Sequence, residues 1–291
     1  MKKIGIVTDS HCGVTFAEAE KLGIRVLPMP LYIDDVCYYE DKTITQKEFF
    51  DKLAVCDKVS TSQASPAEVM DLWNECLEEF ETILCMPMSS GLSGSCNTAK
   101  MFAEYDEFAG RVYVVDNGRI STPMHRSILD ALELIEDGYT AEQIKNILEN
   151  EKDKMSIYIA VETLEYLRRG GRISGATAAI GTILDIKPIL KLSTGLLESH
   201  DKCRGSKKAR RMMIEQIKED IETKFSDYPP EDIYILAATS ADDETTEKWI
   251  EQIKENFPGK TVLCDKLSLG ISCHTGEGAL GIGVSCKPKR A

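Results

Sequence analysis

Residues 88–95 combine serine and glycine at a point where the sequence changes from a strand pattern to a helix pattern. They read MSSGLSGS, after the apolar run 82–86 and before a helix pattern over 97–105. Helix N-termini present unpaired backbone N–H groups, and glycine lets a charged group approach them closely. The segment is therefore either an anion-binding turn, with Ser93 and its neighbours as hydroxyl donors, or an ordinary helix cap.

The same segment partly matches the nucleophile turn of hydrolases. Ser93 lies in Gly91-Leu92-Ser93-Gly94, which lacks the second spacer of the G-x-S-x-G pattern. None of the four histidines stands in an evident hydrolase context. A lipid hydrolase or acyltransferase that uses Ser93 stays as an alternative function. The phosphate-loop pattern G-x-x-x-x-G-K-S/T is absent, so an ATP-binding kinase is not supported.

Two further turns carry side chains that can meet an anion. Arg172 follows Gly170-Gly171 after a short helix pattern, and His274 lies in a polar glycine turn over 273–281. The arginine can face an anion, or it can be a solvated residue after a glycine helix cap. His274 can donate to the same anion, although a lone histidine is usually a structural hydrogen bonder.

Two longer segments are unusual in composition. Residues 175–190 are rich in small and aliphatic side chains, which either leave room for an apolar ligand or allow close helix packing. Residues 202–211 hold six basic residues in an otherwise acidic protein. The basic segment fits a solvated helix face, or a docking site for an acidic partner or a phosphorylated group.

The composition narrows the classes of function. The chain has 291 residues and a formal net charge of -13, which argues against broad binding to nucleic acid or to anionic membranes. No apolar run approaches the length of a membrane span or of a signal-peptide core. The ten cysteines include no C-x-x-C pair. We therefore expect reduced thiols in a cytoplasmic protein, without a metal site or a cofactor.

Strand and helix patterns alternate through the first half of the chain, which indicates a parallel sheet wrapped by helices. A charged stretch at 151–154 is the candidate boundary between two α/β domains, 1–154 and 155–291. The first is expected to be a Rossmann-like parallel-sheet domain and the second a mixed-sheet domain. The expected strands are 4–7, 25–27, 82–86, 112–115, 155–161, 187–192, 196–199, 233–239, 262–264 and 278–285; the expected helices are 17–22, 66–80, 97–105, 124–136, 140–151, 164–168, 175–184, 207–224 and 243–256.

Polar residues that follow the strand patterns define one edge of the first sheet. Ligands of open α/β sheets bind beyond the carboxyl ends of the strands. The residues at these ends are mostly hydroxyl-bearing, and they fall at 8–10, 60–65, 89–95 and 116–117. Histidine and paired carboxylates for acid–base chemistry are not gathered there. The edge is therefore expected to bind a ligand rather than to cleave one.

Five short motifs, in this order along the chain, resemble those of the DegV family. They are TSQAS at 61–65, SSGLSG at 89–94, the segment 164–174, KPIL at 187–190 and HTG at 274–276. The resemblance runs essentially from end to end. It implies a two-domain DegV-type fold with the ligand between the domains, and a protein that binds a long-chain fatty acid without catalytic machinery of its own. It also implies a partner, a separate fatty acid kinase that phosphorylates the presented carboxylate in phospholipid metabolism.

The resemblance also implies roles for individual residues. Thr61 and Ser93 are expected to hydrogen-bond the carboxylate, with Arg172 and His274 close by. Gly205 and Glu277 depart from the family pattern near the docking segment and near His274. The expected ligand-binding and docking residues are Thr61, Ser62, Ser93, Gly94, Arg172 and His274 for the carboxylate; Ile173, Ala176, Ile180, Ile183, Leu184 and Ile189 for the acyl chain; and Arg204, Lys207 and Lys208 for the kinase. A binding module for another small anion is the remaining alternative.

Overall fold

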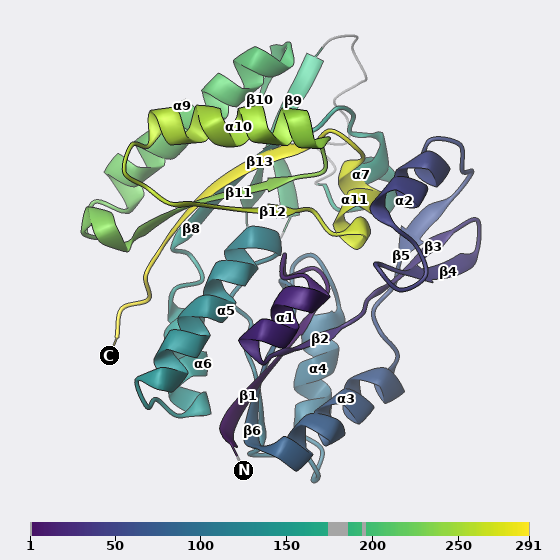
Figure 1. Cartoon of the computed structure of the whole chain (residues 1–291), viewed down its shortest axis with the longest axis vertical. Helices are drawn as coiled ribbons and strands as arrows, with labels where there is room; N and C mark the ends of the chain where they lie inside the picture. Colours follow the sequence, from purple (N-terminus) through teal and green to yellow (C-terminus); the bar gives the residue numbers. More distant parts are fainter. Residues whose placement is uncertain (1, 174–185, 194–195, 291) are drawn as a thin grey trace.

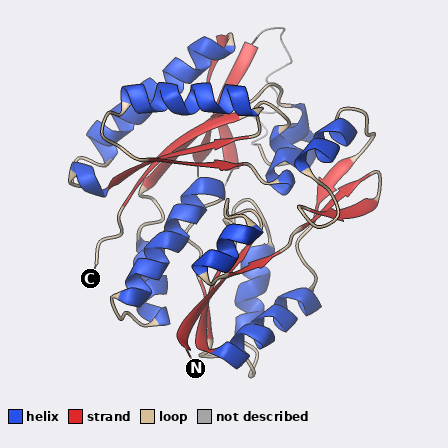
Figure 2. Ribbon diagram, in the orientation of Figure 1, coloured by secondary structure: helices blue, strands red, loops and turns tan. Residues whose placement is uncertain are grey.

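Two larger sheets, one above the other in the view of Figure 1, form the body of the protein. The structure is a computed structural model that describes residues 2–173, 186–193 and 196–290. A third, small sheet lies beside the upper one (Figure 2). This two-sheet α/β architecture confirms the fold class expected from the sequence.

The first sheet is parallel throughout and has the strand order β2-β1-β6-β7. Alternate residues of its strands face opposite sides: Ile6 packs with α5 and α6, and Val7 packs with α3 and α4. Both faces are thus covered, as parallel sheets require. The elements are β1(Lys2–Asp9), α1(Phe16–Leu22), β2(Arg25–Leu27), α3(Pro66–Glu79), β6(Phe80–Met86), α4(Ser95–Ala103), β7(Val112–Val114), α5(Ser121–Glu136) and α6(Ala141–Asn150).

The second sheet is mixed and has the strand order β10-β9-β8-β13-β11-β12. One face packs against α9 and α10 around Met213 and Trp249, and the other face turns toward the first sheet. The elements are β8(Met155–Ala160), α7(Glu165–Gly170), β9(Ile186–Ser193), β10(Leu196–Arg204), α9(Ser206–Lys224), η1(Pro230–Asp232), β11(Ile233–Thr239), α10(Asp243–Asn256), β12(Val262–Lys266), α11(Leu269–Thr275) and β13(Leu280–Cys286). The expected helix over 175–184 and most of the hairpin turn at 193–195 lie outside the described residues.

The small sheet was not expected from the sequence. It consists of β3(Pro30–Ile33), β4(Val36–Tyr39) and β5(Val59–Thr61), with α2(Gln46–Leu53) against it. Leu31 and Phe49 of this unit pack with Leu269 and Cys273 of α11. Strands of three or four residues are too short to establish an alternating pattern, so the sequence carried little signal for them.

The region around 273–281 also differs from the expectation of a polar turn. Residues 269–275 form the helix α11, whose first turn is capped by the Ser268 side chain. Gly276 ends the helix with φ +74, a backbone conformation that favours glycine. His274 therefore lies on a helix rather than on a loop.

The strands change from the first sheet to the second between Asn150 and Met155. The domain division after residue 154 stays a prediction, since the small sheet belongs to the first part of the chain yet packs on α11 of the second. In the described residues, no helix is both long enough and apolar enough to cross a membrane.

Candidate functional site

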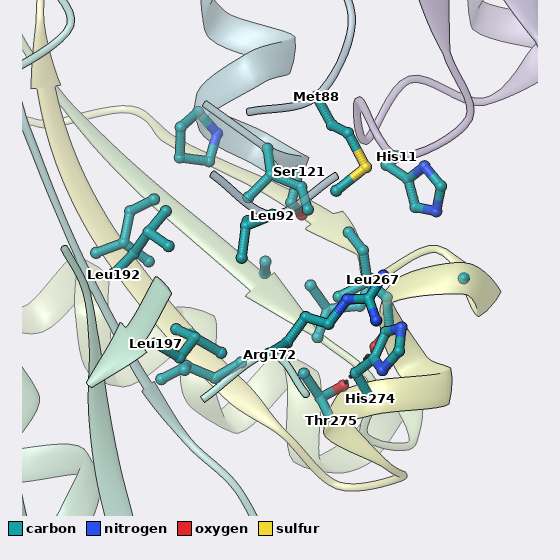
Figure 3. Close-up of a pocket in the computed structure, with 18 of the residues that line it drawn as sticks. His11, Met88, Leu92, Ser121, Arg172, Leu192, Leu197, Leu267, His274 and Thr275 are labelled. Carbon is teal, nitrogen blue, oxygen red and sulfur yellow. Dashed lines mark hydrogen bonds between the residues drawn. The ribbon is translucent and has the colours of Figure 1, made fainter. Parts of the chain in front are cut away.

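A cavity of about 390 Å³ lies between the two larger sheets (Figure 3). Its wall combines the carboxyl-end loops of the first sheet, one face of the second sheet, and α11. In the close-up, His274 and Arg172 lie on one side of the cavity, and Leu192 and Leu197 lie on the other. The cavity thus has a polar side and an apolar side.

All six residues expected at the carboxylate line this cavity, although they come from distant parts of the chain. They are Thr61, Ser62, Ser93, Gly94, Arg172 and His274. The most distant pair, Thr61 and His274, is joined directly by a hydrogen bond of 3.0 Å between Thr61 Oγ1 and His274 Nε2. The packing of the small sheet on α11 brings these two side chains together.

His274 occupies a space that only a glycine neighbour permits. A Cβ atom on Gly170, the last residue of α7, would lie 2.0 Å from His274 Nδ1. Burial lowers the pKa of the His274 imidazole to about 4, and the nearby charges of Arg172 and His11 act in the same direction. The imidazole is therefore neutral near pH 7, and one ring nitrogen carries a proton. His274 Nδ1 has no hydrogen-bond partner in the described structure.

Arg172 is held at the cavity wall by the turn that ends α7. Gly171 takes the left-handed conformation at φ +66, and the Arg172 guanidinium donates from Nη1 to the carbonyl oxygen of Gly170. This arrangement places a half-buried cation beside the neutral His274. An anion at this position would meet a charge-assisted donor.

Carboxylates at the end of the first sheet hold the loop that carries Ser93. Asp9 Oδ2 accepts from the Met88 backbone N–H at 2.7 Å, and Asp116 Oδ2 accepts from the Ser90 hydroxyl at 2.8 Å. Gly94 is the cap residue of α4 and makes no side-chain cap bond. The serine-glycine segment is therefore both the start of a helix and part of the cavity wall.

The hydrogen bonds of Ser93 do not match those of an activated nucleophile. Its Oγ pairs with Ser95 Oγ at 2.8 Å and accepts from the Ser95 backbone N–H at 3.2 Å. Nucleophilic serine requires a base within hydrogen-bond reach, and His274 Nε2 is engaged with Thr61. In the part of the chain that the structure describes, no cluster of histidine, cysteine and carboxylate side chains could hold a metal ion.

The structure corrects part of the expected acyl-chain list. Ile189 belongs to the core on the α9 side of the second sheet, because side chains alternate along β9 and Leu190 and Leu192 face the other way. Ile173 is buried in the same apolar cluster as its bridge partner Leu197, and of the two Leu197 lines the cavity. The expected residues Ala176, Ile180, Ile183 and Leu184 lie outside the described residues.

Several residues that line the cavity were not predicted. On the second sheet they are Ile157, Ile159, Leu192, Leu197, Leu236, Ala238, Gly281 and Gly283; from the loops and α5 come His11, Met88, Leu92 and Ser121. The alternation within each strand was the available signal, since the residues between them face α9 and α10. The loop residues carry no comparable pattern.

The three residues expected at a partner surface are all exposed. Arg204 ends β10, and Lys207 and Lys208 lie in the first turn of α9. None of them forms an ion pair with another described residue. They leave a local excess of positive charge on a protein whose net charge is -13.

Comparisons with known proteins agree with this fold. The family model described as "Uncharacterised protein, DegV family" matches residues 3–287. A DegV domain-containing protein of Clostridium perfringens is 30% identical over 290 residues, which is 97% of each chain. A solved structure titled as fatty acid binding of a DegV family protein from Thermus thermophilus is 32% identical, with a TM-score of 0.86 over 98% of this chain and 99% of that one. DegV of Bacillus subtilis, titled a fatty acid binding protein, is 27% identical with a TM-score of 0.83 over 99% and 100%.

Proposed function

The chain belongs to the DegV family, and from this premise we propose that it binds a long-chain fatty acid in the cavity between its two larger sheets. The observation that carries the proposal is one continuous cavity with a cluster of donors on one side and aliphatic side chains on the other. Relatives of similar fold are described as fatty-acid-binding proteins. A fatty acid, with a carboxylate head and an apolar chain, matches a cavity wall with a polar side and an apolar side.

The carboxylate belongs on the polar side, near Thr61, Ser93, Arg172 and His274. A buried carboxylate must replace its hydration with several donors. The two hydroxyls and the guanidinium provide them, and the neutral imidazole is bonded to Thr61. Ser62 and Gly94 lie in the same wall.

The acyl chain belongs along the face of the second sheet that turns toward the first sheet. Each buried methylene contributes about 0.8 kcal/mol, so the fourteen methylenes of a sixteen-carbon acid contribute about 11 kcal/mol before the costs of association. Leu192, Leu197 and Leu236 offer the apolar surface for this burial. Most of the affinity should therefore come from the chain, and its orientation from the head group.

Organic extraction of the purified protein, followed by mass spectrometry, tests this function. We expect one fatty acid per chain, and we expect the delipidated protein to take up added stearic acid. A protein that neither contains nor takes up a fatty acid contradicts the proposal. Rapid turnover of ester substrates, or labelling of Ser93 by a serine-reactive probe, would favour the hydrolase alternative instead.

We further propose that the protein presents the bound carboxylate to a fatty acid kinase in the cytoplasm, as part of phospholipid metabolism. A lysine in the first turn of a helix interacts unfavourably with the positive end of the helix dipole. Lys207 and Lys208 nevertheless lie in the first turn of α9, beside Arg204. Such a patch suits an acidic partner surface. All ten cysteines are unpaired, which fits a reducing compartment. The test is reconstitution with a purified fatty acid kinase, where phosphorylation of the lipid should depend on this protein.

A further inference from the structure

Two polar residues beyond the proposed carboxylate donors line the cavity. They are His11, which follows β1 and lies near His274, and Ser121, the first residue of α5. Their backbones are joined by a hydrogen bond of 2.7 Å from the Ser121 N–H to the His11 carbonyl oxygen. Each residue is only 5% exposed. In Figure 3 the two side chains lie on either side of Met88, so the contact between these residues is through the backbone.

One polar atom of each side chain lacks a hydrogen-bond partner within the described structure. The Ser121 hydroxyl has none, and His11 Nδ1 lies 3.4 Å from Asp9 Oδ1 without forming a hydrogen bond. A buried polar group left unpaired costs stability, so native proteins usually satisfy such groups. An unpaired serine hydroxyl among the residues that line a cavity indicates that a polar atom of the ligand completes it.

The backbone at this position is also held in an unusual state. Ser121 has φ +54, a conformation that costs energy for a residue with a side chain. It starts a helix of sixteen residues whose cap residue, Ile120, makes no side-chain cap bond. The His11 ring is fixed in place, because a Cβ on Gly270 would lie 2.3 Å from its Nε2.

We propose that the Ser121 hydroxyl recognises a hydroxyl group carried along the chain of the fatty acid. The inference rests on the proposed function, since it assigns a second polar subsite to a ligand whose carboxylate is held by the first. A hydroxyl both donates and accepts, so it complements the serine hydroxyl in either direction. The Ser121 hydroxyl reaches the ligand by rotation about its Cα–Cβ bond.

The adjacent Thr122 provides an internal comparison. It also lines the cavity, but its hydroxyl already donates to the Ala237 carbonyl oxygen at 2.7 Å. Thr122 therefore has no donor left for a ligand hydroxyl and can act toward it only as an acceptor. Only the unpaired neighbour distinguishes an oxygenated chain from a plain one.

The experiment measures dissociation constants of the delipidated full chain for stearic acid and for stearic acids hydroxylated at carbon 3, 10 or 12. The readout is the ratio of the two constants for each isomer. We expect at least one isomer to bind as tightly as stearic acid. Ser121→Gly, which keeps the positive φ accessible, should shift that ratio against the isomer about fivefold, or about 1 kcal/mol. Thr122→Val should leave the ratio at its wild-type value.

The outcomes distinguish a failure of the second subsite from a failure of the proposed fatty acid binding. If stearic acid binds but every hydroxylated isomer binds at least tenfold more weakly, or if Ser121→Gly leaves every ratio unchanged, the second subsite is refuted and the fatty acid function stands. If Thr122→Val shifts the ratio as much as Ser121→Gly does, the assignment to Ser121 is wrong. If neither stearic acid nor any isomer binds, the proposed function itself fails.

Discussion

Replacing Gly170 by alanine should disable the head-group side of the cavity while leaving the fold in place. The added Cβ would lie 2.0 Å from His274 Nδ1 and 2.6 Å from Cε1. The ring must move, and its 3.0 Å hydrogen bond to Thr61 is then lost. Overpacking of this kind costs about 1–3 kcal/mol. Alanine in the last turn of α7 returns about 0.5–1 kcal/mol through helix propensity.

The net loss of about 1–2 kcal/mol should lower the melting temperature by roughly 2–8 °C for a chain of this size. Affinity for stearic acid should fall about tenfold, the effect of one hydrogen bond to a charged group. Differential scanning fluorimetry and displacement of a fluorescent fatty acid measure the two quantities. Gly138→Ala is the matched control, because Gly138 has φ +88 and no atom within 4 Å of an added Cβ. That variant should lose stability and keep its affinity.

A double variant makes the prediction sharper. His274→Ala removes the ring with which the new methyl group collides, so adding Gly170→Ala to it should cost no further stability or affinity. Wild-type affinity in Gly170→Ala would refute the reasoning. So would a double variant that is less stable than His274→Ala by the full cost of the single change.

Three further outcomes follow from the geometry. Ser93→Ala and Arg172→Ala should each weaken stearic acid binding several-fold with little change in melting temperature, and unchanged affinity in both would place the head group elsewhere. Burial opposes the charged form of His125, but its hydrogen bond of 3.1 Å to Asp265 and the nearby Glu18 raise the pKa of the imidazole above its ordinary value. That stabilisation is therefore complete below pH 6.5 and is lost as pH rises through the raised pKa; thermal melts from pH 5 to 9 should show it, and His125→Gln should lack it. Arg204→Ala should keep lipid binding and reduce kinase-dependent phosphorylation in the reconstituted reaction, so equal phosphorylation would remove this residue from the docking surface.

The parts of the fold that the sequence predicted are those with strong periodicity or composition. The parallel first sheet followed from regular alternation of strands and helices, and the range 233–239 was identified with the bounds that the structure has for β11. The small sheet was missed because its strands are held by packing on α11 rather than by a local pattern. Tertiary contact, not sequence preference, decides such short strands.

The candidate site was predicted unevenly for a related reason. Donor side chains are recognisable by type, and all six expected at the carboxylate line one cavity. Apolar side chains are not distinguished by type, and their direction decides which of them reach the ligand. Ile189 and Leu192 are both aliphatic, but they lie three positions apart along β9, and an odd offset places their side chains on opposite faces of the sheet. His11 and Ser121 were missed because isolated polar residues after a strand and at a helix start are common.

The bond between Thr61 and His274 joins residues 213 positions apart. Contacts of such long range form late in folding, because the loop between them must first be closed. In a chain that is synthesised from its N-terminus, Thr61, Ser93 and Arg172 emerge before His274. Without α11 the small sheet has no surface to dock on. Fatty acid capture should therefore begin only after α11 has emerged and docked, which makes the occupied cavity a report that the three sheets have assembled.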